Sequence, residues 1–178
     1  MRKGASKSKG SSFEREISRF LTKWASGQTE ELYYWRSPSS GAVATLNVGN
    51  KDISGDIIAL RPEGAFLTDR FSIEIKTGYS KASFHQHLKD NKNFDIENFW
   101  LQCVDAADRA GKKPMLIYRK LGFPIIVGIG CDTRIRLKEK MKLPKSVHLI
   151  FENKTPSIAF YDMKEFFKII TPNVIKEL

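Results

Sequence analysis

The segment 71–76, FSIEIK, alternates strictly between apolar and polar residues, and this pattern constrains the fold more than any other in the chain. In a β-strand, Phe71, Ile73 and Ile75 share one face and the polar residues share the other. The apolar face requires a core to pack against, so a sheet covered on at least one side is expected. Any half-solvated strand shows the same pattern, so the alternation alone indicates structure and not function.

Further segments predict the elements around this strand. Helices are expected over 12–25, 96–110 and 163–170, with Asp162 as the cap of the last, and strands over 32–35, 56–60, 114–119, 124–130, 147–151 and 158–162. The segment 133–145 is basic and is expected to be exposed. The order of helix, strands, helix, strands and helix predicts an α/β fold with a central mixed β-sheet flanked by helices.

The chain is strongly basic, with a formal net charge of +10 over 178 residues and a sequence pI of about 9.6. Such a surplus favours a polyanionic partner, most often nucleic acid, although a basic surface can also serve solubility alone. Residues 1–11 read as a flexible basic arm, and residues 12–178 as a single domain. The arm carries Arg2, Lys3, Lys7 and Lys9.

The two cysteines indicate neither a disulfide framework nor a zinc knuckle. Cys103 and Cys131 lie far apart with no CxxC pairing, which fits a reducing, intracellular compartment. No apolar run approaches the roughly 20 residues that span a bilayer, so no membrane partner is expected. The basic N-terminus continues into Ser and charged residues, which argues against a signal peptide.

A small set of charged residues has the chemistry that phosphodiester hydrolysis needs. Divalent cations such as Mg²⁺ prefer carboxylate oxygens, and a nearby cation can hold the attacking water. Glu74 and Lys76 are two residues apart on one strand and therefore share a face. If the strand that begins at Asp56 pairs with theirs as a hairpin, Asp56 meets Glu74 at the edge of the sheet. The backbone carbonyl of Ile75 could be a further metal ligand.

An E-x-K pair in a strand is common, and the neighbouring residues decide how it is interpreted. Asp52 is a second acidic candidate, but it precedes the strand, so Asp56 is favoured. The pattern G-D-I-I-A-L … F-S-I-E-I-K-T resembles the PD-(D/E)XK nuclease superfamily. The resemblance implies a restriction-endonuclease-like core in which Asp56 and Glu74 bind metal and Lys76 is catalytic. Gly55 stands where the family often has Pro.

The wider chain, from about residue 3 to 119, is similar to the archaeal and viral Holliday junction resolvases of that superfamily. The matching stretches are G-x-x-F-E-R-E at 10–16, R-x-P-x-S-G-x at 36–42 and a G-x-K-P turn at 111–114. By this resemblance, Glu14 reaches the metal site, Ser40 or Ser39 is the catalytic-loop serine, and Gln102 is the helix glutamine. The segment after Lys76 is longer than in compact resolvases, and the chain continues past about 120 as a C-terminal extension.

The resemblance implies a DNA endonuclease that uses Mg²⁺ or Mn²⁺ and acts as a homodimer on branched junction DNA, in recombination and repair. A cytoplasmic or nucleoid-associated location and a viral or mobile-element origin would fit such a nuclease. The alternatives are a restriction-type, nicking or flap-cutting nuclease and a non-catalytic DNA-binding protein on the same fold. The residues expected to contact DNA are Arg2, Lys3, Lys7, Lys9, Arg15, Arg36, Arg134, Arg136 and Lys138.

Several of these residues also have a simpler interpretation. Ser11-x-x-Glu14 fits a capping box, in which Glu14 serves only the helix start. Gln102 could be a plain exposed helix residue, and the basic run at 134–145 could be a solvated surface. His85 and His87 are more typical of a solvated or phosphate-contacting segment than of metal ligands.

Overall fold

The computed structural model describes residues 4–28, 30–37, 54–79, 82–85, 95–151 and 155–178, and within residues 4–9 it describes the backbone alone. Several residues singled out from the sequence lie outside these limits. They are Arg2, Lys3, Ser39, Ser40, Asp52 and His87, together with the side chains of Lys7 and Lys9.

The centre of the molecule is a five-stranded mixed sheet with the strand order β3-β4-β5-β7-β6. Its strands are β3 (Phe71–Thr77), β4 (Lys113–Arg119), β5 (Ile126–Gly130), β7 (Ile158–Asp162) and β6 (Ser146–Leu149). Strand β3 runs parallel to β4, and the other three pairings are antiparallel. The expected α/β class with a central mixed sheet flanked by helices is confirmed.

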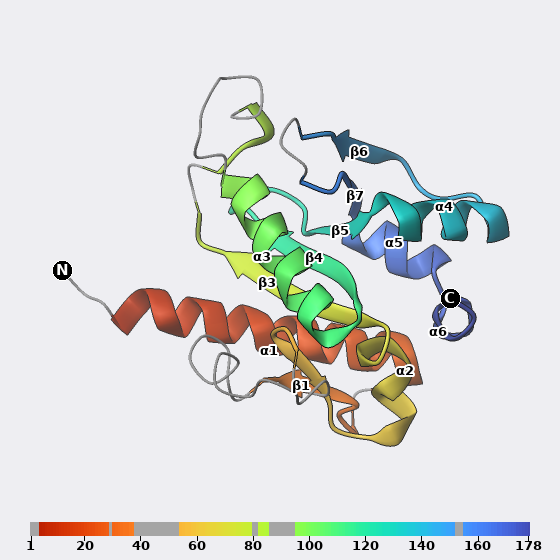
Figure 1. The fold of residues 1–178 in the computed structure, drawn as a ribbon. Helices are drawn as coiled ribbons and strands as arrows, with labels where there is room; N and C mark the ends of the chain where they lie inside the picture. Colours follow the sequence, from red (N-terminus) through yellow and green to blue (C-terminus); the bar gives the residue numbers. More distant parts are fainter. Residues whose placement is uncertain (1–3, 29, 38–53, 80–81, 86–94, 152–154) are drawn as a thin grey trace.

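Helices cover both faces of the sheet. Ile73 and Ile75 of β3 belong to the core cluster that includes α1 (Gly4–Ser26) and α5 (Met163–Ile169). On the other face, Leu116 of β4 packs in a second cluster with α3 (Asp95–Ala110). Figure 1 shows α3 crossing the sheet on one side and α1 running below it. The helix expected over 96–110 is confirmed, and its sheet-facing residues Trp100, Cys103 and Ala107 are all 0% exposed.

A smaller sheet pairs β1 (Tyr34–Arg36) with β2 (Ile57–Ala59) in antiparallel register. The hairpin considered between β2 and β3 is therefore wrong. The intervening chain forms a 3-10 turn, η1 (Pro62–Gly64), and a short helix, α2 (Ala65–Thr68), instead of a tight turn. This connection brings the chain back parallel to β3, with a single bridge between Gly55 and Ile73.

Helix α1 begins at Gly4, eight residues before the expected start at Ser12. Residues 4–11, predicted as a flexible arm, are thus helical. Because Ser11 lies inside the helix, it does not occupy the N-cap position, and the capping-box interpretation of Glu14 is wrong.

The last third of the chain completes the central sheet. After β5 come α4 (Cys131–Lys140), β6, β7 and α5, and β7 lies between β5 and β6. The strands expected over 147–151 and 158–162 are present as β6 and β7, which pair in antiparallel register. The Asp162 cap is confirmed, since the Asp162 side chain accepts hydrogen bonds from two backbone N–H groups of α5. A final short helix, α6 (Pro172–Lys176), was not predicted. Within the described ranges, no helix is long and apolar enough to span a membrane.

Candidate metal centre at the edge of β3

Asp56 is held against the free edge of β3 by two backbone contacts. Its N–H donates to the Ile73 carbonyl at 2.7 Å, and its Oδ2 accepts from the Ile75 N–H at 2.8 Å. The residue is 9% exposed. Its carboxylate is therefore fixed beside the middle of β3, although β2 itself belongs to the smaller sheet.

Gly55 makes this close approach possible. Its φ is +78°, and a Cβ placed there would lie 2.5 Å from the Ile73 carbonyl oxygen. A side chain would be strained in this left-handed conformation and would also collide with β3. Proline fixes φ near −65°, so the proline that the sequence resemblance implies at this position could not adopt the conformation seen here.

Glu74 and Lys76 project from the same face of β3, as the alternation predicted. Lys76 Nζ lies 2.6 Å from Glu74 Oε1, and both side chains are 17% exposed. Both lie on the face that α3 covers, and Lys76 Nζ is 5.9 Å from the centre of the Phe99 ring on α3. The pair is thus partly shielded from water and held in one orientation.

The carboxylate of Asp56 is electrostatically disfavoured. Burial raises its pKa from the ordinary value of 3.8 to about 7, and the negative charges of Glu74 and Glu14 add to this effect. The Ile75 hydrogen bond and the charge of Lys76 oppose the rise without cancelling it. A buried acidic group in this state is stabilised by an additional positive charge, which a metal ion would provide.

Lys76 is affected in the opposite sense. Burial acts to lower its pKa, but the charge of Glu74, the hydrogen bond with Glu74 and the charge of Asp56 outweigh burial and raise the pKa. Lys76 therefore stays protonated at neutral pH and can act as a fixed hydrogen-bond donor.

Glu14 of α1 lies near this centre but is tied to another partner. Its Oε2 is 3.1 Å from Arg36 Nε on β1, and its side chain is 13% exposed. The contact is an ion pair by distance but lacks hydrogen-bond geometry. Among the described residues, no three His, Cys, Asp or Glu side chains are grouped to hold one ion. The structure thus brings together two carboxylates, with Glu14 as a nearby charge.

The donors present fit a hard divalent cation. Mg²⁺ is commonly bound through one or two carboxylates and keeps several waters, so Asp56 and Glu74 are sufficient protein ligands. The N–H and C=O of one strand residue point to the same side. Because the Ile75 N–H faces Asp56, the Ile75 carbonyl lies on the same edge and could be a third oxygen ligand.

The remaining predicted residues are more scattered. Gln102 is exposed on α3, one residue before Cys103, whose thiol lies 3.8 Å from the Ser72 carbonyl. Arg15 is exposed on α1, and Arg36 is occupied by Glu14. Arg134, Arg136 and Lys138 lie on α4, which follows β5 and lies away from the β3 edge in Figure 1.

Sequence reasoning did not identify Arg119, at the end of β4. Arg119 is paired with Thr77 in the sheet register, and its guanidinium lies 3.9 Å from the centre of the Phe13 ring and 2.7 Å from Glu16. Parallel strands end at the same edge of a sheet, so the last residues of β3 and β4 lie close together. A basic residue at the end of the next strand after the E-x-K strand was therefore the signal that could have identified Arg119.

The parallel β3–β4 pair, the acid held at its edge and the Glu-x-Lys strand define a nuclease of the PD-(D/E)XK type. The family model of phage putative PDDEXK endonucleases matches residues 5–177. The chain therefore belongs to this family of endonucleases. No curated protein and no solved structure is significantly similar to it.

Proposed function

We propose that the protein is a metal-dependent DNA endonuclease whose active site is Asp56, Glu74 and Lys76. The observation that carries this proposal is the position of the Asp56 carboxylate, which the Ile75 N–H holds at the edge of the strand that bears the Glu74–Lys76 pair. Two carboxylates held together against their own repulsion need a cation, and phosphodiester hydrolysis at such a site uses one. Mg²⁺ is the proposed ion, with Mn²⁺ as its substitute.

Asp56 and Glu74 hold the cation, and the Ile75 carbonyl adds a neutral oxygen. When bound, the cation polarises the phosphate and makes the attacking water more acidic. Lys76, held protonated by Glu74 and Asp56, donates to that water or to the developing charge on phosphorus-bound oxygen. Glu14 assists from the periphery, through a water or by keeping Arg36 oriented toward DNA. Ser40 and Gln102 are proposed to position the phosphate.

For the substrate we propose branched DNA, cut by a homodimer with two such sites. Support comes from the sequence similarity to junction resolvases, in particular the G-x-x-F-E-R-E start of the first helix. The position of Glu14 adds to it, because this residue is close enough to Asp56 for its charge to raise the aspartate pKa.

The test is cleavage of labelled four-way junction, flap, linear duplex and single-stranded DNA in Mg²⁺, Mn²⁺ or EDTA. Symmetrical metal-dependent cutting of the junction alone is the expected result. Equal cutting of all four DNA substrates would support the assigned active site and overturn the proposed preference for junctions. Binding without any cutting would favour the alternative of a non-catalytic DNA-binding protein.

A further inference from the structure

A pocket of about 610 Å³ lies between α4, the following loop and strands β6 and β7. It is separate from the metal centre, because β7 lies three strands from β3 in the sheet order. Three strand spacings correspond to about 14 Å along the sheet. The lining includes four basic side chains, Arg134, Lys138, Lys140 and Lys142, against one acidic side chain, Glu139.

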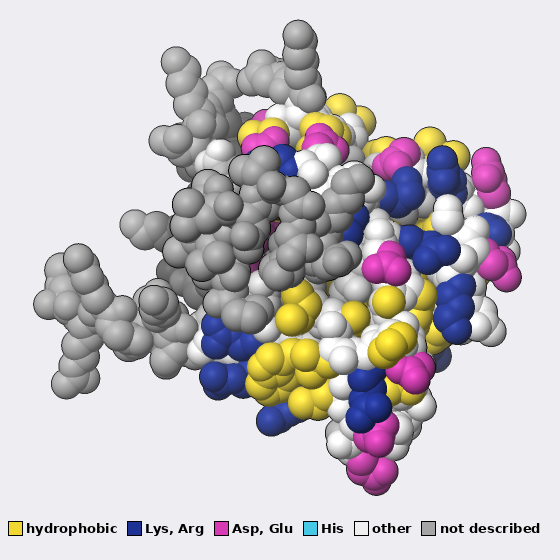
Figure 2. All heavy atoms as spheres, turned by 60° about the horizontal axis from the view of Figure 1, so that its bottom comes forward, with side chains coloured by type: hydrophobic (Ala, Val, Ile, Leu, Met, Phe, Trp, Pro, Cys, Tyr) yellow, Lys and Arg dark blue, Asp and Glu magenta, His cyan; other side chains and the backbone are white. Residues whose placement is uncertain are grey.

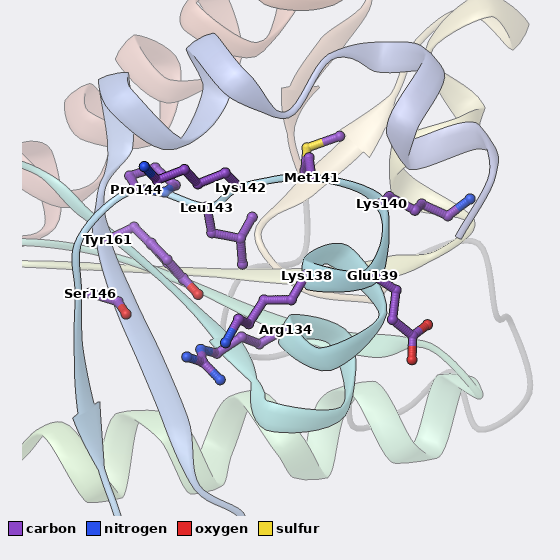
Figure 3. A pocket seen from close by; sticks show the side chains of 10 residues that line it. All are labelled: Arg134, Lys138, Glu139, Lys140, Met141, Lys142, Leu143, Pro144, Ser146 and Tyr161. Carbon is purple, nitrogen blue, oxygen red and sulfur yellow. The ribbon is translucent and has the colours of Figure 1, made fainter.

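The polar groups of four residues converge at one end of this pocket. Figure 3 shows the Arg134 guanidinium, the Lys138 ammonium and the Tyr161 hydroxyl pointing toward one another, with the Ser146 hydroxyl nearby. In contrast, Lys140 points away from this group and pairs with Glu177 at 3.2 Å. The converging end is therefore donor-rich and positively charged.

Two of the converging polar atoms are buried without a hydrogen-bond partner. Arg134 Nε and the Tyr161 hydroxyl are both shielded from solvent, and neither meets the geometry of a full hydrogen bond within the described residues. Arg134 and Ser146 nevertheless lie close enough to the Tyr161 hydroxyl to oppose the rise of its pKa that burial causes. Tyr161 as a whole is 2% exposed. A buried donor without a good partner has lost its interaction with water and gained little in return, so such groups are candidates for binding a ligand or a water.

The positive charge of this region also affects its neighbours. Burial lowers the pKa of His148 on β6, and the charges of Arg134 and Lys138 lower it further. In the described part of the chain, neither of these two cations has an ion pair with a carboxylate. The adjoining surface differs, since Figure 2 shows basic and acidic side chains interspersed on the side where α4 and α6 lie.

We infer that this pocket is a phosphate-binding site, in which Arg134, Lys138 and Tyr161 donate hydrogen bonds to one phosphate group. The Ser146 hydroxyl lies beside them and is paired with His148 Nε2 at 2.8 Å. A phosphate has several strong acceptor oxygens and a negative charge, which match a convergent set of donors with two uncompensated cations. Carboxylates offer fewer acceptors, and a neutral ligand would leave the charge unbalanced.

The phosphate has two chemical sources, a DNA backbone or a small phosphate such as a nucleotide or inorganic phosphate. The DNA source rests on the proposed function and would add a backbone contact remote from the scissile bond. Phosphate binding itself does not depend on nuclease activity, so the two ideas can fail separately.

The experiment is calorimetric titration of the full chain with inorganic phosphate at low salt, for the native protein and for Arg134→Gln and Tyr161→Phe. We expect each substitution to weaken phosphate binding roughly tenfold or more, because hydrogen bonds to a charged group are lost. Arg109→Gln makes the same charge change at an exposed position of α3 and should leave phosphate binding unaltered.

Thermal unfolding of Tyr161→Phe separates a binding role from a structural one. The hydroxyl has only imperfect contacts with Arg134 and Ser146 to lose, so the melting temperature should change little while phosphate binding falls. A lower melting temperature with unchanged phosphate binding would mean that the hydroxyl is bonded within the protein, and the inference would be overturned.

The source is decided by binding a labelled 20-base-pair duplex in EDTA over a range of salt concentrations. If DNA fills the pocket, Arg134→Gln should weaken binding and reduce the slope of log affinity against log salt by about 0.9 per lost phosphate contact. An unchanged DNA slope with weakened phosphate binding supports the site and assigns it to a small phosphate. No change in either titration overturns the site.

Discussion

The edge of β3 and the pocket beside α4 carry uncompensated charge of opposite sign. At β3, burial and two neighbouring carboxylates raise the pKa of Asp56 to about 7. Beside α4, two cations lack acidic partners and two buried donor atoms are unpaired among the described residues. Each region is unfavourable as it stands, and the sign of the imbalance indicates the ligand, a metal cation at one and a phosphate at the other.

The two regions also differ in how they are assembled. The β3 site takes its groups from a single strand and from a segment that returns parallel to it, so its parts are fixed by backbone hydrogen bonds. The α4 pocket depends on side chains from a helix, a loop and two strands. Substitutions at the β3 site should therefore lower the cleavage rate, and substitutions in the α4 pocket should weaken phosphate binding.

The largest expected effect is that of Glu74→Ala. Removing a proposed metal ligand should lower the cleavage rate at saturating DNA by roughly a thousandfold or more. DNA affinity in EDTA should stay the same or rise, because a negative charge is removed near the binding surface. Glu30→Ala, at an exposed site, is the control and should cleave normally. Comparable rates for Glu74→Ala and the native protein would contradict the assignment.

Lys76→Met should reduce the cleavage rate by about a hundredfold, since one positioned donor is lost while both carboxylates remain. Single-turnover kinetics would measure the cleavage rate, and Mn²⁺ titration would measure metal affinity. The Mn²⁺ affinity of Lys76→Met should be retained. Lys168→Met, an exposed lysine on α5, provides the matched control. A loss of Mn²⁺ binding with Lys76→Met would mean that Lys76 only maintains the site.

Gly55→Ala tests whether the close approach to β3 holds Asp56 in place. Gly27→Ala is its control, because Gly27 has a similar φ of +76° but nothing within 4 Å of its added Cβ. Both should lose about 1 kcal/mol of stability from the left-handed backbone. Gly55→Ala should lose about 1–3 kcal/mol more from the collision, and cleavage should fall with it. Equal effects in chemical denaturation would show that the close approach is unimportant.

A last prediction concerns the dependence of stability on pH. Because the folded-state pKa of Asp56 is raised from 3.8 to about 7, the folded protein holds this proton more tightly than the unfolded chain. The associated stability is present below pH 4 and is lost as the pH rises through 7. In EDTA, the difference in melting temperature between Asp56→Asn and the native protein should therefore shift in favour of Asp56→Asn as the pH rises from 5 to 8. A constant difference would contradict the raised pKa.

The sequence predicts most of the fold and the shared face of Glu74 and Lys76 on β3, because these depend on short-range patterns. Alternation in 71–76 places Glu74 and Lys76 on one face, and helical spacing places Trp100 and Cys103 in the core. The sequence did not predict that the segment around Asp56 runs parallel to β3. That direction depends on how η1 and α2 turn the chain between the two. The early start of α1 was also missed, since the Gly- and Ser-rich composition of residues 4–11 argues against a helix.

The α4 pocket shows the limit of the same reasoning. The basic run at 134–145 was visible in the sequence, but nothing in it distinguishes Arg134, which converges with Tyr161, from Arg136, which contacts the Leu178 carbonyl. Tyr161 was predicted only as part of a strand. The burial of its hydroxyl beside Arg134 follows from the packing of α4 against β7, which short-range patterns do not encode.

The most direct test of the central claim is a calorimetric titration of Mn²⁺ into the native protein and into Glu74→Ala at pH 8. The native protein should bind Mn²⁺, and Glu74→Ala should lose that binding while remaining folded. If the native protein binds no Mn²⁺, or if Glu74→Ala binds it equally well, then Asp56 and Glu74 do not form the metal centre of this endonuclease.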